Sequence, residues 1–211
     1  LTIKITGGNV DAITIAIAPF EWAGGETPPT AEFDRIISDD LQRSGEFKPS
    51  SRLDQPPATP FGESVSHATW RERGINNLVT GKVTSVAGRY RVEFILYDTV
   101  EGKQVTKDTV YAAVKDQRFA AHHVADLVYE ALTGERGAFA TRIAFVVANR
   151  RANSLQVSDS DGHGAKTNLA TNDPIMSPSW SPDGKKLAYV SFEGGQPAIY
   201  VQNVESGSRK K

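Results

Sequence analysis

Apolar and polar positions near the start of the chain form two different patterns. Residues 1–6 alternate between apolar and polar side chains, whereas residues 12–18 are almost continuously apolar and rich in isoleucine. Alternation is typical of a strand with one buried face, and a continuous apolar run is typical of a strand buried on both faces. Because Gly7 and Gly8 separate the two segments, we predict a tail, residues 1–11, followed by a central strand.

Three segments have the apolar spacing of three to four residues that is typical of amphipathic helices. They are residues 30–44, residues 64–73 and residues 116–132. A glycine, which readily adopts the left-handed conformation that ends many helices, follows shortly after each of them. In the last segment the buried side is predicted to consist of Ala120, Val124, Leu127, Val128 and Ala131.

Between the second and third helices, residues 78–83, 89–98 and 104–113 have the pattern of strands. Alternation in the middle strand predicts one side made of Tyr90, Val92, Phe94 and Leu96 and an opposite side that carries Arg91 and Glu93. Strands in one sheet with helices packed against it form an α/β domain. We therefore predict a mixed sheet flanked by helices over residues 12–138.

After this first domain the helical spacing stops and a repeat of short apolar segments begins. Leu187 lies 44 residues after Ile143, and Ile199 lies 44 residues after Leu155, each within a matching apolar segment. Blades of β-propellers repeat with a period of roughly 40 to 50 residues. Residues 139–211 are therefore predicted to be all-β and to form the start of a β-propeller. Since a closed propeller needs roughly four to eight blades, we expect the chain to be part of a longer protein.

The composition excludes several classes of function. The 211 residues include 24 basic and 25 acidic side chains, a formal net charge of -1, so no basic field is present to bind nucleic acid. The absence of cysteine excludes disulfides, thiolate catalysis and cysteine-bound metals. The longest apolar run, residues 13–20, is too short to span a membrane. A chain without thiols suits an oxidising compartment. A start at Leu1 fits either removal of a leader or a trimmed sequence, so the missing signal peptide does not argue against export.

The sequence contains few candidates for catalysis or metal binding. His122 and His123 are neighbours on a predicted helix and point about 100° apart, which favours ordinary histidines over a metal site. Residues 159–162 resemble the start of a calcium loop, but His163 and Ala170 stand where that loop needs other residues, so this stretch predicts a hairpin turn. The chain has no G-x-S-x-G motif and no phosphate-binding glycine loop. We therefore predict no catalytic residue, no metal site and no cofactor.

Residues 176–190 contain Trp180, Asp183 and Gly184 around a predicted turn between two strands. We assign Trp180 to the core of a blade and Asp183 to the turn, because neither residue needs a catalytic role to be explained. This segment resembles the blade signature of the TolB family. The resemblance extends along essentially the whole chain, through residues 18–20, 40–49, 70–83 and 132–144.

The resemblance implies a six-bladed propeller, of which this chain holds only the opening blades. It also implies a monomeric, non-catalytic adaptor in the periplasm, within the Tol–Pal system that maintains the outer membrane and draws it inward during cell division. The implied partners are the inner-membrane-anchored protein TolA and the outer-membrane lipoprotein Pal, with other envelope proteins and bacteriocins as further protein partners. Nucleic acid and membrane insertion are not expected.

The tail is the part of the chain to which the resemblance assigns TolA binding. An extended tail of this kind can add a strand to a partner's sheet, since its alternating side chains would fall on two faces. Pal-binding residues are not assigned, because most of the propeller is missing. The implied TolA-binding residues are Leu1, Thr2, Ile3, Lys4, Ile5, Thr6, Gly7, Gly8, Asn9, Val10 and Asp11.

Two other functions are compatible with the residues. The chain could belong to a periplasmic enzyme, a hydrolase or peptidase, whose active site lies outside this segment, or to a passive scaffold. Sequence beyond Lys211 separates the enzyme from the adaptor, and capture of partners from an envelope extract separates the scaffold from it. Taken without the resemblance, residues 1–11 would be interpreted as an edge strand of the α/β domain.

Overall fold

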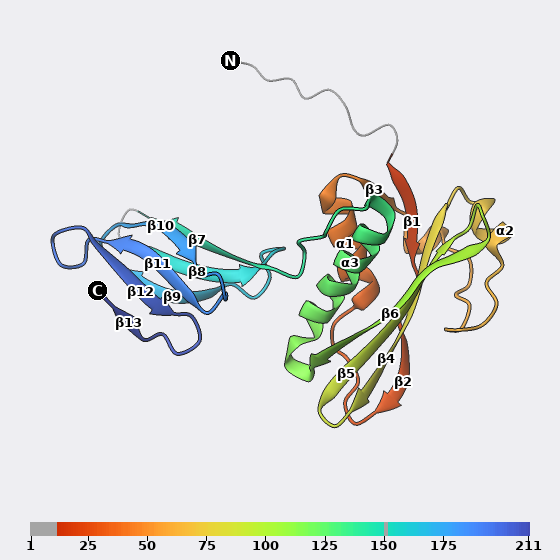
Figure 1. Ribbon diagram of the computed structural model, residues 1–211, viewed down its shortest axis with the longest axis horizontal. Helices are drawn as coiled ribbons and strands as arrows, with labels where there is room; N and C mark the ends of the chain where they lie inside the picture. The colour runs from red at the N-terminus through yellow and green to blue at the C-terminus, as the bar shows by residue number, and fades with distance from the viewer. Residues whose placement is uncertain (1–11, 150–151) are drawn as a thin grey trace, which may run out of the picture. The chain divides into compact units, whose positions relative to one another are not determined.

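The structure, a computed structural model, describes residues 12–149 and 152–211 (Figure 1). The chain divides into two compact units, of which the first ends at Ala140 and the second covers Thr141–Lys211. The predicted tail, residues 1–11, lies outside the described residues. Among the residues that are described, no helix is both long and apolar enough to cross a bilayer.

The first unit is built on a six-stranded mixed sheet, which confirms the predicted α/β class. The strands follow the order β3-β1-β4-β5-β6, with β2 paired to β4. Strand β1 lies parallel to both β3 and β4, whereas β4, β5 and β6 form an antiparallel meander. The strands are β1 (Ile13–Ile17), β2 (Glu21–Gly25), β3 (Phe47–Pro49), β4 (Asn77–Val86), β5 (Arg89–Asp98) and β6 (Lys103–Ala113).

Three α-helices accompany this sheet, at the three places that the apolar spacing predicts. They are α1 (Phe33–Ser44), α2 (His67–Arg71) and α3 (Gln117–Thr133). Two short 3-10 turns, η1 (Arg52–Asp54) and η2 (Val114–Asp116), precede α2 and α3. Helices α1 and α3 end at Gly45 and Gly134, whose φ angles of 81° and 77° are left-handed. Both helices lie on the same side of the sheet (Figure 1).

The main core of the first unit lies between α1, α3 and the sheet. The prediction for α3 is correct for Ala120, Val124 and Val128, which are fully buried. It is wrong for Ala131, which is exposed, and Leu127 is only half-buried. The buried stripe instead widens toward Ala121, Ala125 and His122, because α3 packs against both the sheet and α1 and so buries two adjacent faces.

A smaller apolar cluster lies on the opposite side of the sheet, between the sheet and α2. Its buried members are Ala16, Ala18, Val65, Trp70, Ile75 and Leu78, and Tyr97 packs against them. Because β1 contributes to this cluster and to the main core, it is buried on both faces, as its continuous apolar sequence predicts.

The second unit consists of two antiparallel sheets, and its described residues contain no helix. One sheet is β7 (Arg142–Ala148), β8 (Asn153–Asp159) and β9 (Lys166–Thr171). The other is β10 (Ile175–Trp180), β11 (Lys186–Ser191), β12 (Ala198–Asn203) and β13 (Arg209–Lys210). Strands β7 and β8 correspond to β11 and β12 across the 44-residue repeat, which confirms the propeller prediction. The two sheets are blades of an open propeller segment and do not close into a ring.

The two sheets of this unit pack on each other through their inner faces and leave their outer faces exposed. Leu155, Leu187 and Tyr189 are fully buried between them. On the outer face of the second sheet, Met176 and Ile199 are 52% and 66% exposed. An apolar outer face is what a blade presents when another blade packs on it, as the propeller prediction requires.

Candidate functional site

The sequence-predicted TolA-binding residues, Leu1 to Asp11, lie outside the described residues, so their role stays a prediction. The strand that follows them is firmly held. The Ile13 amide donates a hydrogen bond of 2.9 Å to the Glu46 carbonyl, and β1 pairs with β3 on one side and with β4 on the other. The tail therefore joins the first unit at an anchored central strand.

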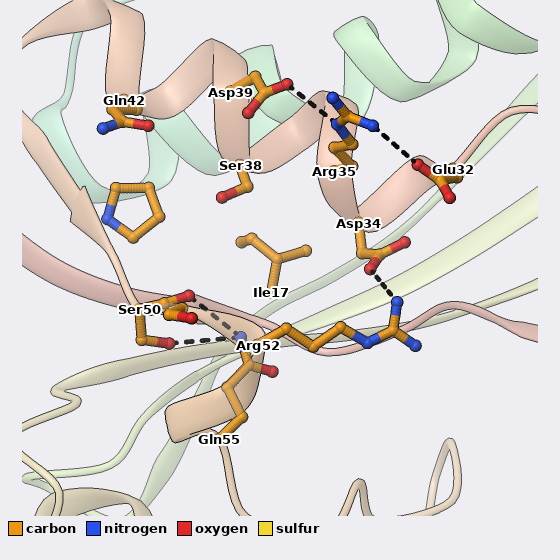
Figure 2. A pocket seen from close by; sticks show the side chains of 12 residues that line it. Ile17, Glu32, Asp34, Arg35, Ser38, Asp39, Gln42, Ser50, Arg52 and Gln55 are labelled. Atoms are coloured by element: carbon orange, nitrogen blue, oxygen red, sulfur yellow. Dashed lines mark hydrogen bonds and ion pairs between the residues drawn. The ribbon is translucent and has the colours of Figure 1, made fainter.

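A pocket of about 390 Å³ lies beside α1, and Ile17 of β1 contributes to its floor (Figure 2). Its walls come from one face of α1 and from the segment that follows β3. Asp34 on α1 and Arg52 on η1 face each other there, with Oδ2 and Nη1 3.4 Å apart. The remaining lining residues are Glu32, Arg35, Ser38, Asp39, Gln42, Pro49, Ser50, Ser51 and Gln55.

The charges in this pocket are paired within the chain. Arg35 contacts Glu32 at 3.4 Å and Asp39 at 3.8 Å, and these three side chains are all mostly exposed. Burial raises the pKa of the Asp34 carboxyl, although the Arg52 guanidinium opposes that shift. Neither histidine nor lysine lines the pocket to serve as a base for its serines. The pocket can accept a polar group, but its residues do not form a nucleophile–base pair.

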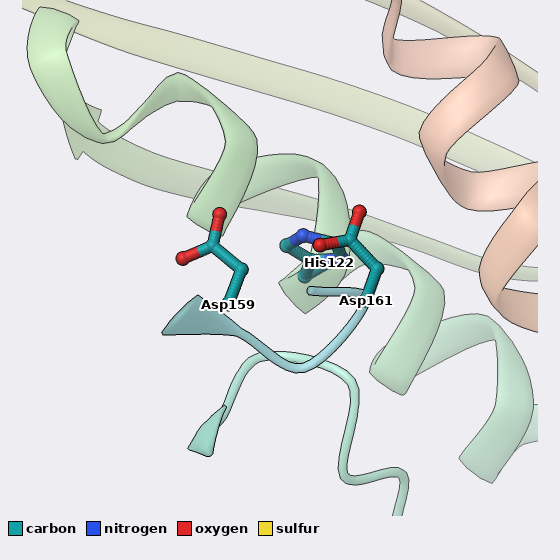
Figure 3. Close-up of side chains that lie close together, drawn as sticks. All are labelled: His122, Asp159 and Asp161. Atoms are coloured by element: carbon teal, nitrogen blue, oxygen red, sulfur yellow. The ribbon is translucent and has the colours of Figure 1, made fainter. Parts of the chain in front are cut away.

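A buried polar contact that the sequence analysis missed joins α1 to α3. His122 Nδ1 and Asp40 Oδ2 lie 2.6 Å apart, and the two side chains are 2% and 1% exposed. Arg43 Nη2 lies 2.6 Å from the other Asp40 oxygen. His122 projects from α3 (Figure 3), whereas its neighbour His123 is half-buried and stacks on the Phe119 ring. The two adjacent histidines thus have different environments. In the sequence, the apolar neighbours Ala121 and Ala125 widen the apolar stripe toward His122, and this is the signal that could have indicated its burial.

Residues 159–162 form the turn between β8 and β9, which confirms the hairpin interpretation. The Gly162 amide donates to the Asp159 carbonyl at 2.9 Å, and the Asp159 amide donates to the His163 carbonyl at 3.0 Å. The Asp161 carboxylate accepts the His163 amide at 2.9 Å. Figure 3 shows Asp159 at the end of β8 and Asp161 in the turn that follows.

The turn between β10 and β11 has the structural roles that were predicted for it. Asp183 Oδ1 accepts hydrogen bonds from the Ser181 hydroxyl at 2.6 Å and from the Lys185 amide at 3.0 Å. These two bonds, the hydroxyl first, lower the pKa of Asp183. Trp180 packs against the core of the second unit, and the Arg142 guanidinium lies 5.2 Å from the centre of its ring. The contacts of Asp183 are those of a turn residue, and those of Trp180 are those of a residue at the core of a blade.

Comparison with known proteins matches the chain to two family models. The TolB amino-terminal domain matches residues 1–105, and the TolB beta propeller domain matches residues 129–211. The chain is 42% identical to the Tol-Pal system protein TolB of Thioalkalivibrio sulfidiphilus and 40% identical to that of Xanthomonas oryzae pv. oryzae, and both alignments cover 100% of the chain. The chain belongs to the TolB family.

A solved structure of the same family supports this assignment. The crystal structure of TolB from Acinetobacter baumannii is 38% identical and matches 94% of this chain with a TM-score of 0.81. The match covers 49% of that TolB chain, and the two curated relatives are covered over 50% and 49% of their lengths. The chain thus spans about half the length of the TolB relatives it matches.

Proposed function

We propose that this chain is the N-terminal half of a non-catalytic periplasmic adaptor that links TolA to the lipoprotein Pal. The observation that carries the proposal is the match of the whole chain to proteins named as Tol-Pal system components. The pocket beside α1 supports the non-catalytic part, because its charges are paired and none of its serines faces a histidine or lysine. The exposed outer face of β10–β12 supports a larger propeller, on which the Pal contact would be built.

In this proposal, Leu1 to Asp11 bind TolA by adding a strand to an exposed edge of its sheet. Backbone hydrogen bonds would supply affinity, and alternate side chains would supply specificity. Leu1, Ile3 and Ile5 share one face of such a strand, and Gly7 and Gly8 let it leave the domain at a free angle. Strand β1 pairs with β3 and β4, so the first unit holds β1 in place without any contribution from residues of the tail.

Deletion of residues 1–9 tests the proposal. We expect the shortened chain to lose binding to the purified periplasmic part of TolA, measured by isothermal titration calorimetry, while the melting temperature of the first unit stays nearly unchanged. TolA binding that survives the deletion would rule out the tail as the binding element. A large fall in melting temperature would instead identify residues 1–9 as an edge strand of the domain.

A further inference from the structure

The sheet of the first unit has one face covered by α1 and α3 and an opposite face that is covered only in part (Figure 1). Alternation along β4, β5 and β6 divides their side chains between these two faces. Toward the β4–β5 hairpin the second face is exposed: Val86 and Tyr111 are 61% and 60% accessible. The open face, as we define it, consists of Val86, Arg89, Arg91, Lys107, Thr109 and Tyr111.

The open face carries an excess of positive charge. On this side of the sheet lie the four cations Lys82, Arg89, Arg91 and Lys107 and the two carboxylates Glu21 and Glu93, on a chain whose formal net charge is -1. Glu93 is the cross-strand partner of Thr109 and so lies on the same side as the open face, but this residue is only 7% exposed. Its oxygens contact Lys82 Nζ at 3.3 Å and Arg91 Nη2 at 3.0 Å, so its charge is already balanced within the protein. A surface of this sign attracts acidic groups.

Neighbouring contacts orient two of the cations of the open face, Arg91 and Lys107. The bond to Glu93 orients the Arg91 guanidinium, whose side chain is half exposed. The Phe61 ring lies 5.9 Å from Lys107 Nζ, and the Phe61 amide donates to the Glu21 carboxylate on β2. Tyr111 is the cross-strand partner of Arg91. Preorganised arginine and tyrosine side chains are the kinds of residue that dominate binding energy at protein interfaces.

Docking across this face is favoured over strand addition at the edge of the sheet. Strand β6 is the outer strand, but the Asp108 carboxylate accepts the Thr109 amide at 2.6 Å and so occupies a donor that a partner strand would need. The register between β5 and β6 also shifts near Tyr97, which distorts the start of that edge. Side-chain charges and irregular register are common protections of edge strands.

The spacing of two arginines defines the chemistry of a partner. Arg89 and Arg91 are two residues apart on β5, so they project on the same side about 7 Å from each other. An extended peptide with a carboxylate at every second residue presents its charges at the same interval. We infer that the open face binds an extended acidic segment of a partner protein, with alternate glutamate or aspartate side chains on Arg89 and Arg91 and the aliphatic part of one of these acidic side chains against Tyr111, which lies beside Arg91.

A fluorescent ten-residue peptide with glutamate at every second position and serine between tests this inference on the 211-residue chain. We expect saturable binding by fluorescence anisotropy, with amide chemical-shift changes concentrated in β5 and β6. Arg89→Glu and Tyr111→Ala should each weaken binding at least tenfold. The matched controls are Lys48→Glu, at an exposed position of β3, and Phe119→Ala on α3, where Phe119 is 51% exposed. Both variants should bind as the wild type does.

Several outcomes would overturn the inference. Equal binding of a peptide with glutamine in place of glutamate would remove the charge argument. Equal binding of a peptide with the same glutamates in one consecutive block would remove the spacing argument. Failure of the acidic peptide to bind would also contradict the inference. If the chain then bound phosphatidylglycerol vesicles and Arg89→Glu abolished that binding, the face would be assigned to a lipid surface. If the chain instead self-associated and Arg89→Glu abolished the self-association, the face would be assigned to a second copy of the chain.

Discussion

The contact between Asp40 and His122 is a deeply buried polar interaction between α1 and α3, with both side chains at most 2% exposed. Removal of the Asp40 carboxylate takes away its contacts with both His122 and Arg43, and loss of one member of a buried pair typically costs about 3 kcal/mol. We therefore expect Asp40→Ala to lower the free energy of unfolding by roughly that amount. Urea unfolding of the full chain, followed by tryptophan fluorescence, measures the change.

Asp39→Ala is the matched control for this substitution, because Asp39 is the preceding residue on α1 but its side chain is 61% exposed. Its ion pair with Arg35 is a surface contact, so its loss should change the unfolding free energy by less than about 0.5 kcal/mol. Equal effects of the two substitutions would contradict a special role for the buried pair.

Asp34 gives a prediction for the pH dependence of stability. Burial raises its pKa above the ordinary value of 3.8, against the opposing charge of Arg52, while Glu32 adds to the rise. A carboxyl whose pKa is raised on folding contributes stability below its unfolded pKa, and the contribution is lost as the pH rises through the folded pKa. Asp34→Asn should therefore be at least as stable as the wild type near pH 7, and the difference should vanish near about pH 3.

Urea unfolding at the two pH values measures the difference in unfolding free energy between Asp34→Asn and the wild type. A less stable variant near neutral pH would show that the Arg52 contact outweighs burial.

Individual side chains show where the sequence was informative and where it was not. Alternation along β5 correctly separates Val92 and Phe94 from Arg91 and Glu93. It does not reveal that Glu93 is buried, because that burial depends on Lys82 from the neighbouring strand. The same holds for His122, whose partner Asp40 lies 82 positions earlier in the chain. Periodicity reports which side a residue faces, but not which distant residue covers it.

At the scale of elements, Gly81 marks a place where β4 and Phe20 approach closely. A Cβ atom at Gly81 would overlap the Phe20 ring, which stacks on Phe33 of α1 with ring centres 5.8 Å apart. Gly81→Ala should therefore destabilise the first unit by about 1 to 3 kcal/mol through overpacking. Thermal or urea unfolding measures the change. Gly194→Ala, where an added methyl meets no atom within 4 Å, is the control and should have little effect; equal losses would contradict the packing argument.

Elements with a strong period were predictable, and short edge elements were not. Strand β5 and the helices α1 and α3 bury a periodic apolar side, so their residues carry the pattern, whereas β6 buries only Val110 and Ala112. Strand β2 is mostly exposed and contains Gly24 and Gly25 with φ angles of 97° and 125°, and β3 has only three residues. Such strands are defined by backbone pairing to β4 and β1 rather than by side-chain burial, and they leave no period in the sequence.

At the scale of the whole molecule, the repeat identified the propeller because each blade must bury an apolar face on its neighbour. Leu155 on β8 and Leu187 on β11 belong to the two neighbouring sheets and meet in the core between them. Ile199 and Val201 on β12 remain exposed on the outer face. The candidate site was less predictable. Neither the pocket beside α1 nor the open face on β5 and β6 has a motif in the sequence, since both assemble from separate segments.

The claim at the centre of this account is that Leu1 to Asp11 bind TolA as an added strand, and a pair of substitutions on opposite faces tests it most directly. Titration of the purified periplasmic part of TolA into Ile3→Asp and Thr2→Asp variants compares a charge on the apolar face with the same charge one residue away on the polar face. The account predicts that Ile3→Asp weakens binding at least tenfold, whereas Thr2→Asp weakens it by less than about threefold. Equal effects of the two substitutions, or no effect of either, would contradict it.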